Sequence, residues 1–138
     1  MTTSWTPKLT NVSGTDGTTT SGRYAAANGM CTFTAMIVAR KETTAASDAG
    51  FGLTLPVPAA PGARYTFQLE YDGQDADNGV WTGEALIYAG SSGTKIDRLR
   101  VTTDVNGAAL DNIGHLYGDS EGAVNAEIIT VTGSYPTA

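Results

Sequence analysis

The chain has little of the equipment used for metal binding or covalent chemistry. Cys31 is the only cysteine among 138 residues, and His115 is the only histidine. A single thiol cannot form an intramolecular disulfide or a thiolate metal cluster, and a single imidazole excludes a multi-histidine metal site. We therefore expect packing to stabilise the fold, with Cys31 as a small buried hydrophobic residue.

Charge is also scarce, and positive charge is not concentrated anywhere. Charged residues make up 16% of the chain, which carries 8 basic and 14 acidic residues and a formal net charge of −6. The only close basic pairs are Arg40 with Lys41 and Arg98 with Arg100. Nucleic-acid binding needs several cations on one face, so we expect no nucleic-acid partner.

Long apolar runs are missing as well. Met1–Thr10 contains no apolar segment typical of a secretory signal, and no stretch approaches the roughly 18 apolar residues of a membrane span. We therefore expect no membrane partner and a protein that folds in a cytoplasm.

The chain is rich in threonine, serine and glycine, and its apolar residues alternate with polar ones. Tyr65–Tyr71 alternates most clearly, which is typical of a half-buried strand. The pattern predicts one all-β domain over 1–138, an antiparallel β-sandwich or jelly roll of about eight strands with negligible helix. The expected strands are Trp5–Thr10, Ser21–Ala25, Met30–Ala39, Gly50–Leu55, Tyr65–Tyr71, Val80–Tyr88, Ile96–Thr102 and Ala126–Ser134.

Some of these segments carry more specific expectations. Met30–Ala39 becomes continuously apolar, which favours a central strand covered on both faces. Val80–Tyr88 and Ile96–Thr102 are separated by a glycine-containing connection and should pair antiparallel. The strand at Gly50–Leu55 should end at Pro56, because proline has no N–H to donate. Gly107–Tyr117 has apolar residues spaced by three, a short hint of a helical turn.

Catalytic and cofactor sites are not predicted. His115, Asp119 and Ser120 could nominally form a triad, but residues so close in sequence rarely reach triad geometry. Gly118-Asp119-Ser120 is similar to the start of a lipase motif whose other parts are missing. We therefore expect no enzymatic activity, no catalytic residues and no cofactor.

The densest acidic segment is Asp72–Gly79. Its carboxylates do not fit the register of an EF-hand calcium loop, and its composition favours a solvated hairpin turn. A calcium site of another geometry stays open as the alternative, and no metal ligand is predicted.

Four aromatic residues on expected strands could either fill the core or form a platform for a sugar ring: Tyr65, Tyr71, Trp81 and Tyr88. Alternating positions in a small sandwich favour the core. Glycan binding stays the alternative.

Four segments together are similar to one known domain. In order, they are Trp5–Thr10, Gly22–Tyr24, Leu53–Ala60 and Val131–Tyr135. Their order and spacing resemble those of a domain found in virion proteins of tailed phages that infect actinobacteria. These virion proteins are minor tail or head appendage proteins. The resemblance implies a compact β-sandwich displayed on a virion, as a capsid decoration protein or as the terminal domain of a tail fibre.

On this basis, the chain is expected to be a virion structural protein that decorates and steadies the capsid exterior. Its partners would be the major capsid protein or other virion proteins. A tail appendage that binds a host receptor or glycan is the alternative. The low charge favours a homo-oligomer, with a trimer as the prediction. The predicted docking residues are Trp5, Thr6 and Pro7, because an aromatic ring and a preset proline lose little entropy on binding.

Overall fold

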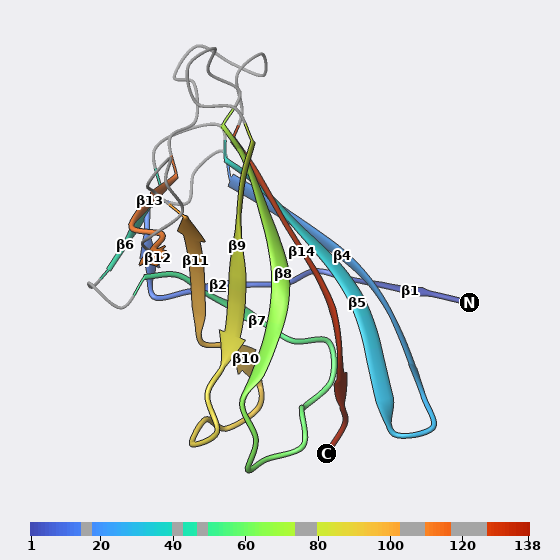
Figure 1. Ribbon diagram of the computed structural model, residues 1–138. Helices are drawn as coiled ribbons and strands as arrows, with labels where there is room; N and C mark the ends of the chain where they lie inside the picture. Colours follow the sequence, from blue (N-terminus) through green and yellow to red (C-terminus); the bar gives the residue numbers. More distant parts are fainter. Residues whose placement is uncertain (15–17, 40–42, 47–49, 74–79, 103–109, 117–126) are drawn as a thin grey trace.

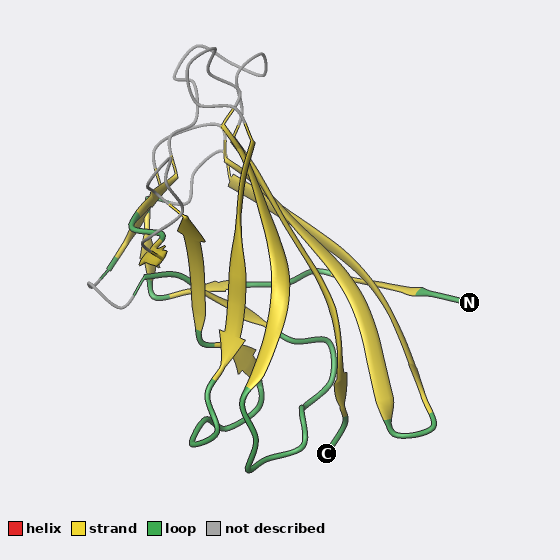
Figure 2. Cartoon of the chain, viewed as in Figure 1, coloured by secondary structure: helices red, strands yellow, loops and turns green. Residues whose placement is uncertain are grey.

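The fold is all-β. The computed structural model describes residues 1–14, 18–39, 43–46, 50–73, 80–102, 110–116 and 127–138. Within these ranges every regular element is a strand, every strand pairing is antiparallel, and no helix occurs (Figure 2). The predicted fold class is confirmed.

One large sheet dominates the molecule (Figure 1). Its long central strands pair over most of their length, and a short strand forms each edge of the sheet. Its 8 strands, in spatial order, are β1 (Thr3–Trp5), β4 (Thr18–Ala27), β5 (Met30–Ala39), β14 (Glu127–Pro136), β8 (Tyr65–Gly73), β9 (Val80–Ile87), β11 (Arg98–Thr102) and β12 (Leu110–Asn112).

Two small sheets form the second layer. In the view of Figure 1, the sheet that contains β7 lies behind the large sheet, and the sheet that contains β6 lies at its left. One has 3 strands in the order β10 (Lys95–Ile96), β7 (Gly52–Thr54) and β2 (Leu9–Thr10). The other has 3 strands in the order β13 (His115–Leu116), β6 (Thr43–Ala45) and β3 (Val12–Ser13). The two layers are those of an antiparallel sandwich, and this strand order does not confirm the jelly-roll alternative.

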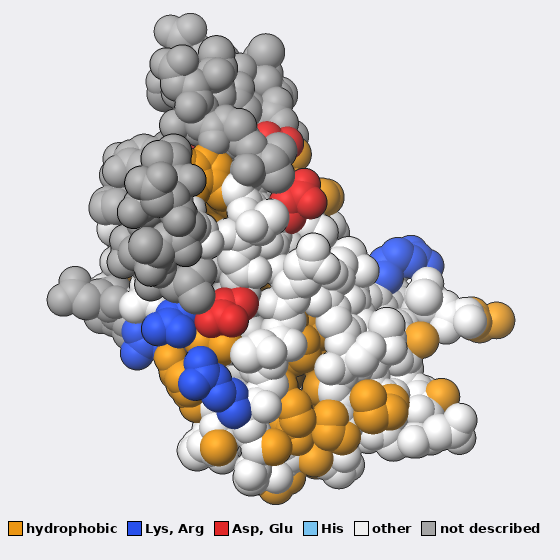
Figure 3. Space-filling view, in the orientation of Figure 1, with side chains coloured by type: hydrophobic (Ala, Val, Ile, Leu, Met, Phe, Trp, Pro, Cys, Tyr) orange, Lys and Arg blue, Asp and Glu red, His pale blue; other side chains and the backbone are white. Residues whose placement is uncertain are grey.

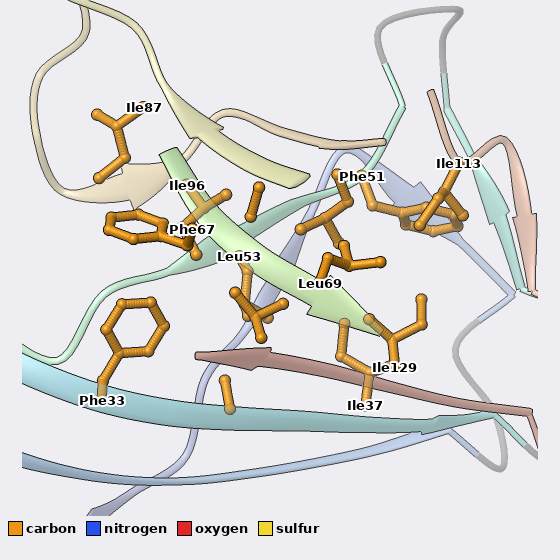
Figure 4. Packing of buried hydrophobic residues seen from close by; sticks show 14 of the residues in the cluster. Phe33, Ile37, Phe51, Leu53, Phe67, Leu69, Ile87, Ile96, Ile113 and Ile129 are labelled. Carbon is orange, nitrogen blue, oxygen red and sulfur yellow. The ribbon is translucent and has the colours of Figure 1, made fainter. Parts of the chain in front are cut away.

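The core lies between the layers (Figure 4). Phe67 and Leu69 of the large sheet point toward Leu53 and Ile96 of the second layer, and all four side chains are buried. Cys31 is fully buried in the same cluster, as predicted. Because side chains alternate across a strand, each long strand of the large sheet has one inward face that builds this core.

The prediction that Met30–Ala39 is covered on both faces is wrong. Along β5, buried residues alternate with exposed ones, and Met36 keeps 38% of its surface in solvent. No described element lies over the other face of the large sheet, so an antiparallel sheet with one solvated face explains the pattern. Apolar Met36 and half-buried Val38 stand on that outer face, which is why the sequence appeared continuously apolar.

An aromatic cluster lies in the core, and one of its rings, that of Phe67, packs closely against Gly133. The rings of Phe33 and Phe67 meet edge to face with 5.0 Å between centroids, and Tyr135 lies 5.9 Å from Phe67. A Cβ atom at Gly133 would lie 2.4 Å from Cδ1 of Phe67. Glycine at position 133 therefore leaves the space that the Phe67 side chain occupies against β14.

The predicted pairing of 80–88 with 96–102 is confirmed by β9 and β11. Ile96 itself leaves that strand and pairs with Leu53 in the second layer. The strand at Gly50–Leu55 stops before Pro56, as predicted. The expected strand at Trp5–Thr10 instead splits into β1 and β2, which belong to different layers. Pro7 lies between them and cannot donate to a ladder.

The hint of a helical turn at Gly107–Tyr117 is wrong where it can be compared. Leu110–Asn112 and His115–Leu116 are strands, while residues 107–109 and 117 lie outside the described residues. Leu110–Asn112 pairs with β11, and His115–Leu116 pairs with β6. Pairing with distant strands overrides a short local periodicity.

Candidate functional site

The outer face of the large sheet is the candidate site, because no other described element covers it. Figure 3 views this face, and its centre is filled by backbone and uncharged polar side chains. Hydroxyl groups occupy several outward positions of two neighbouring strands, namely Thr32 and Thr34 of β5 and Thr130 and Thr132 of β14. From β1 to β14, Arg23 is the only charged side chain at an outward position of the described strands.

A groove of about 870 Å³ lies at the β1 edge of this face. Arg23 crosses from β4 to β1, donating from Nε to Oγ1 of Thr2 at 3.0 Å and from Nη1 to Oγ of Ser4 at 3.2 Å. Thr34 and the apolar side chain of Met36 line the groove further in. Hydroxyl groups both donate and accept hydrogen bonds, so the groove can hold an uncharged polar surface of a partner.

Two of the three predicted docking residues line this groove. Trp5 and Thr6 line it, whereas Pro7 is buried. The carbonyl of Pro7 accepts a short hydrogen bond from the hydroxyl of Thr20. Trp5 packs over Gly22 and is half-buried against the core, so of these three side chains Thr6 alone is exposed.

The opposite end of the same face carries positive charge. The guanidinium carbons of Arg64 and Arg98 lie 5.7 and 5.8 Å from the centroid of the Tyr88 ring. Arg100, two residues further along β11, lies 3.6 Å from a carboxylate oxygen of Glu84. Blue and red groups accordingly gather at the lower left of Figure 3, away from the uncharged centre. Attraction between the ring face and each cation helps hold the two arginines.

The aromatic prediction is right for only part of its set. Tyr65 and Tyr71 are half-buried and pack against the core, as predicted. Trp81 is half-buried and is not among the residues that pack against the core cluster. Tyr88 belongs to the charged end of the outer face, because it follows β9 in register with outward Leu86. The four rings therefore do not share one platform.

The residues considered for catalysis and calcium binding fall largely outside the described part of the chain. His115 pairs through its backbone with Thr44, whereas Asp119 and Ser120 lie outside the described residues. Asp72 pairs with Val80, while residues 74–79 of the acidic segment also lie outside. Among the described residues, no three histidine, cysteine or acidic side chains are grouped closely enough to bind a metal ion.

Two buried polar groups of the core have partners within the protein. Tyr71 donates a short hydrogen bond to the buried carboxylate of Glu127. The hydroxyl of buried Tyr135 donates to the carbonyl of Val57 at 2.8 Å. Burial, reinforced by the neighbouring Cys31, raises the pKa of Tyr135 well above its ordinary value. These two hydrogen bonds link β14 to β8 and to the segment that contains Val57.

Sequence reasoning missed the cluster of Arg64, Tyr88 and Arg98. The close pair Arg98 and Arg100 was visible as a signal, and alternation places both on one face of a strand. Arg64 is distant in sequence and reaches Tyr88 only through the pairing of β8 with β9. That pairing could not be read from local composition.

The fold and surfaces together define an antiparallel β-sandwich with one uncovered polar face. Comparison with protein-family models, with curated proteins and with solved structures finds no match. In the described part of the chain, no helix is long and apolar enough to cross a membrane.

Proposed function

We propose that this chain is a structural protein of a bacteriophage particle that decorates the capsid exterior and steadies the shell. The resemblance of four segments to virion domains supplies the setting. The uncovered outer face of the large sheet is the observation that supports a docking role.

The composition of this face suits contact with another protein. Burying an ion without a partner is costly. At the end of the face that holds the groove, from β1 to β14, Arg23 is the only charged side chain at an outward position of the described strands. Met30 and Met36, at 45% and 38% exposure, stand on β5 at this end. Methionine is enriched at protein interfaces and adapts its shape to a partner. A polar, weakly charged surface with apolar anchors can therefore lose water at low cost.

The partner in this proposal is the major capsid protein or another virion protein, and the groove is the contact surface. A tail appendage that binds a host receptor or glycan is the second candidate. The cluster of two arginines around Tyr88 favours it, because this cluster lies at the end of the face away from the groove.

Copy number separates these two functions. Decoration of an icosahedral shell implies tens to hundreds of copies for each particle, as an order of magnitude set by symmetry, whereas a tail appendage implies only a few rings. Densitometry of purified virions against the major capsid protein measures this ratio directly. A faint band together with antibody labelling on the tail would contradict decoration.

A charge placed in the groove tests the contact surface itself. Thr34 is exposed and lines the groove, so Thr34→Arg should lower occupancy on particles by at least about tenfold through an unpaired buried charge. Ser13→Arg is the matched control, because Ser13 is exposed on β3 in the second layer. Equal occupancy for the two variants would exclude the groove as the docking surface.

A further inference from the structure

We infer that Arg64, Tyr88 and Arg98 form a binding site for the carboxylate or phosphate group of an acidic polysaccharide. This inference does not depend on decoration of a capsid. It concerns the end of the outer face away from the groove, and it gives that end a ligand of defined chemistry.

The strand order sets the geometry of the cluster. β9 lies between β8 and β11. Arg64 directly precedes β8 and Arg98 begins β11, so the two arginines approach Tyr88 from neighbouring strands on either side. Each guanidinium lies within 6 Å of the ring centroid, at 5.7 and 5.8 Å. The Tyr88 ring thus has two cations within 6 Å of its centroid, one from each neighbouring strand.

Ion pairs do not neutralise the two arginines of this cluster within the described part of the chain. Neither Arg64 nor Arg98 forms an ion pair with a described carboxylate, whereas Arg100 pairs with Glu84. The nearest acidic residue in sequence is Asp97, whose carboxylate accepts a hydrogen bond from the backbone N–H of Tyr88 at 2.9 Å. That carboxylate therefore positions the tyrosine. Two unpaired guanidinium groups beside one ring are arranged for an external anion.

A buried apolar residue, Leu86, pairs directly with Arg98. Leu86 is fully buried although it faces outward, and it is not part of the main core cluster. Its cross-strand neighbours are Thr66 and Arg98. The aliphatic stem of an arginine can cover apolar surface while its charged end stays in water. An Arg98 stem lying across Leu86 would account for the burial of Leu86. Such packing would also limit the motion of the Arg98 guanidinium.

The surroundings favour a sugar over an acidic peptide. Thr66 is exposed and pairs with Leu86, and Ser92 and Thr94 are exposed in the connection that follows Tyr88, where their hydroxyls lie 2.8 Å apart. Such groups can bond to sugar hydroxyls. A peptide interface instead relies on apolar or aromatic anchors in its centre. The large exposed apolar side chains of the described residues are Met1, Met30 and Met36, all near the opposite edge.

The experiment is a calorimetric titration of the intact protein at low ionic strength. The acidic probes are trigalacturonate, which carries carboxylates, and glucose 1-phosphate, which carries a sugar-linked phosphate. The methyl ester of trigalacturonate is the neutral counterpart. We expect binding of at least one acidic probe and none of the ester, with affinity that falls as salt is added. Absence of binding by both acidic probes at millimolar concentration would overturn the inference.

Variants assign the binding to the cluster. Arg64→Gln and Arg98→Gln should each weaken it by at least about tenfold, because each removes charge-assisted hydrogen bonds. Lys8→Gln removes the same charge from an exposed residue between β1 and β2 and should change affinity less than about twofold. Equal losses in all three variants would show attraction to overall charge and would overturn the site. Arg64 is exposed, so its variant keeps the test valid if Arg98→Gln unfolds.

Two further probes test the class of ligand. Inorganic phosphate bound as tightly as the sugars would show a simple anion site and overturn sugar recognition. An octaglutamate peptide bound more tightly than trigalacturonate would overturn it in favour of a protein partner. The Thr34→Arg variant should bind the sugar as wild type does, so failure of particle docking and failure of this site can be told apart.

Discussion

Tyr135 shows how one side chain connects distant parts of this sandwich. It lies on β14 opposite Cys31 of β5, and its hydroxyl reaches the carbonyl of Val57. Its ring also belongs to the cluster with Phe33 and Phe67. The residue is fully buried, so both its ring and its hydroxyl group must be satisfied by the protein.

Tyr135→Phe should therefore destabilise the protein at neutral pH by about 1 to 3 kcal/mol, because the carbonyl of partly buried Val57 loses its donor. Urea unfolding measures this change. Tyr24→Phe is the control, since the hydroxyl of Tyr24 has no hydrogen bond among the described residues. Equal effects of the two substitutions would contradict the assigned role.

The same pair of proteins should respond differently to alkali. Burial raises the pKa of Tyr135 in the folded state, whereas an unfolded tyrosine ionises near a pKa of about 10. Its contribution to stability is thus fully present below about pH 10 and declines above it, by about 1.4 kcal/mol for each pH unit. The stability advantage of wild type over Tyr135→Phe should shrink above that pH. An advantage that stays constant would contradict this prediction.

At the scale of elements, the β1 edge joins the core to the groove. β1 pairs with only part of β4, from Gly22 to Tyr24. Trp5 fills the space over Gly22, where a Cβ atom would lie 2.2 Å from the indole ring. The ring also meets Tyr24 and Phe33 edge to face, with centroids 6.0 and 6.2 Å away. The groove therefore has a wall that depends on core packing.

Trp5→Ala should lower the free energy of unfolding by about 2 to 3 kcal/mol, below the full range for a completely buried ring. Trp5→Phe should cost less, because it keeps a ring over Gly22 and removes an indole N–H that has no partner among the described residues. Thermal unfolding of both variants checks this order. Wild-type stability in Trp5→Ala would show that β1 is only an attached segment.

This role changes how the predicted docking segment should be tested. Deletion of Met1–Pro7 removes Trp5 and buried Pro7 as well as groove residues, so loss of particle binding would not distinguish unfolding from lost contact. Substitution of exposed Thr6 separates the two effects, because its side chain is on the surface.

For the whole molecule, the two ends of the outer face differ in chemistry. The β1 end is weakly charged and carries Met30 and Met36, whereas the β11 end carries Arg64, Arg98 and Arg100. A protein partner at one end and an anionic glycan at the other would not compete for the same side chains. One sheet can therefore support both proposals.

Self-association is a further prediction at this scale. Few charges and many hydroxyl groups allow a large patch to lose water without isolating ions, and we expect a homotrimer. Multi-angle light scattering over a range of micromolar concentrations measures the mass in solution. A strict monomer both in solution and on the particle would contradict this expectation.

Local sequence patterns determined the class of fold and most long strands. Alternation identified β5 with its correct bounds, and β8 and β14 within a few residues, because inward and outward side chains repeat every second residue. Proline and glycine correctly marked where a strand ends or turns. These properties depend on neighbouring residues, so a single sequence contains them.

Tertiary pairing decided the rest. Ile96 left its predicted strand to pair with Leu53, and Leu110–Asn112 became a strand through β11. Arg64 and Arg98 meet at Tyr88 only because β9 lies between β8 and β11. Each of these contacts joins segments distant in sequence, and its free energy comes from packing and hydrogen bonds that local periodicity does not specify.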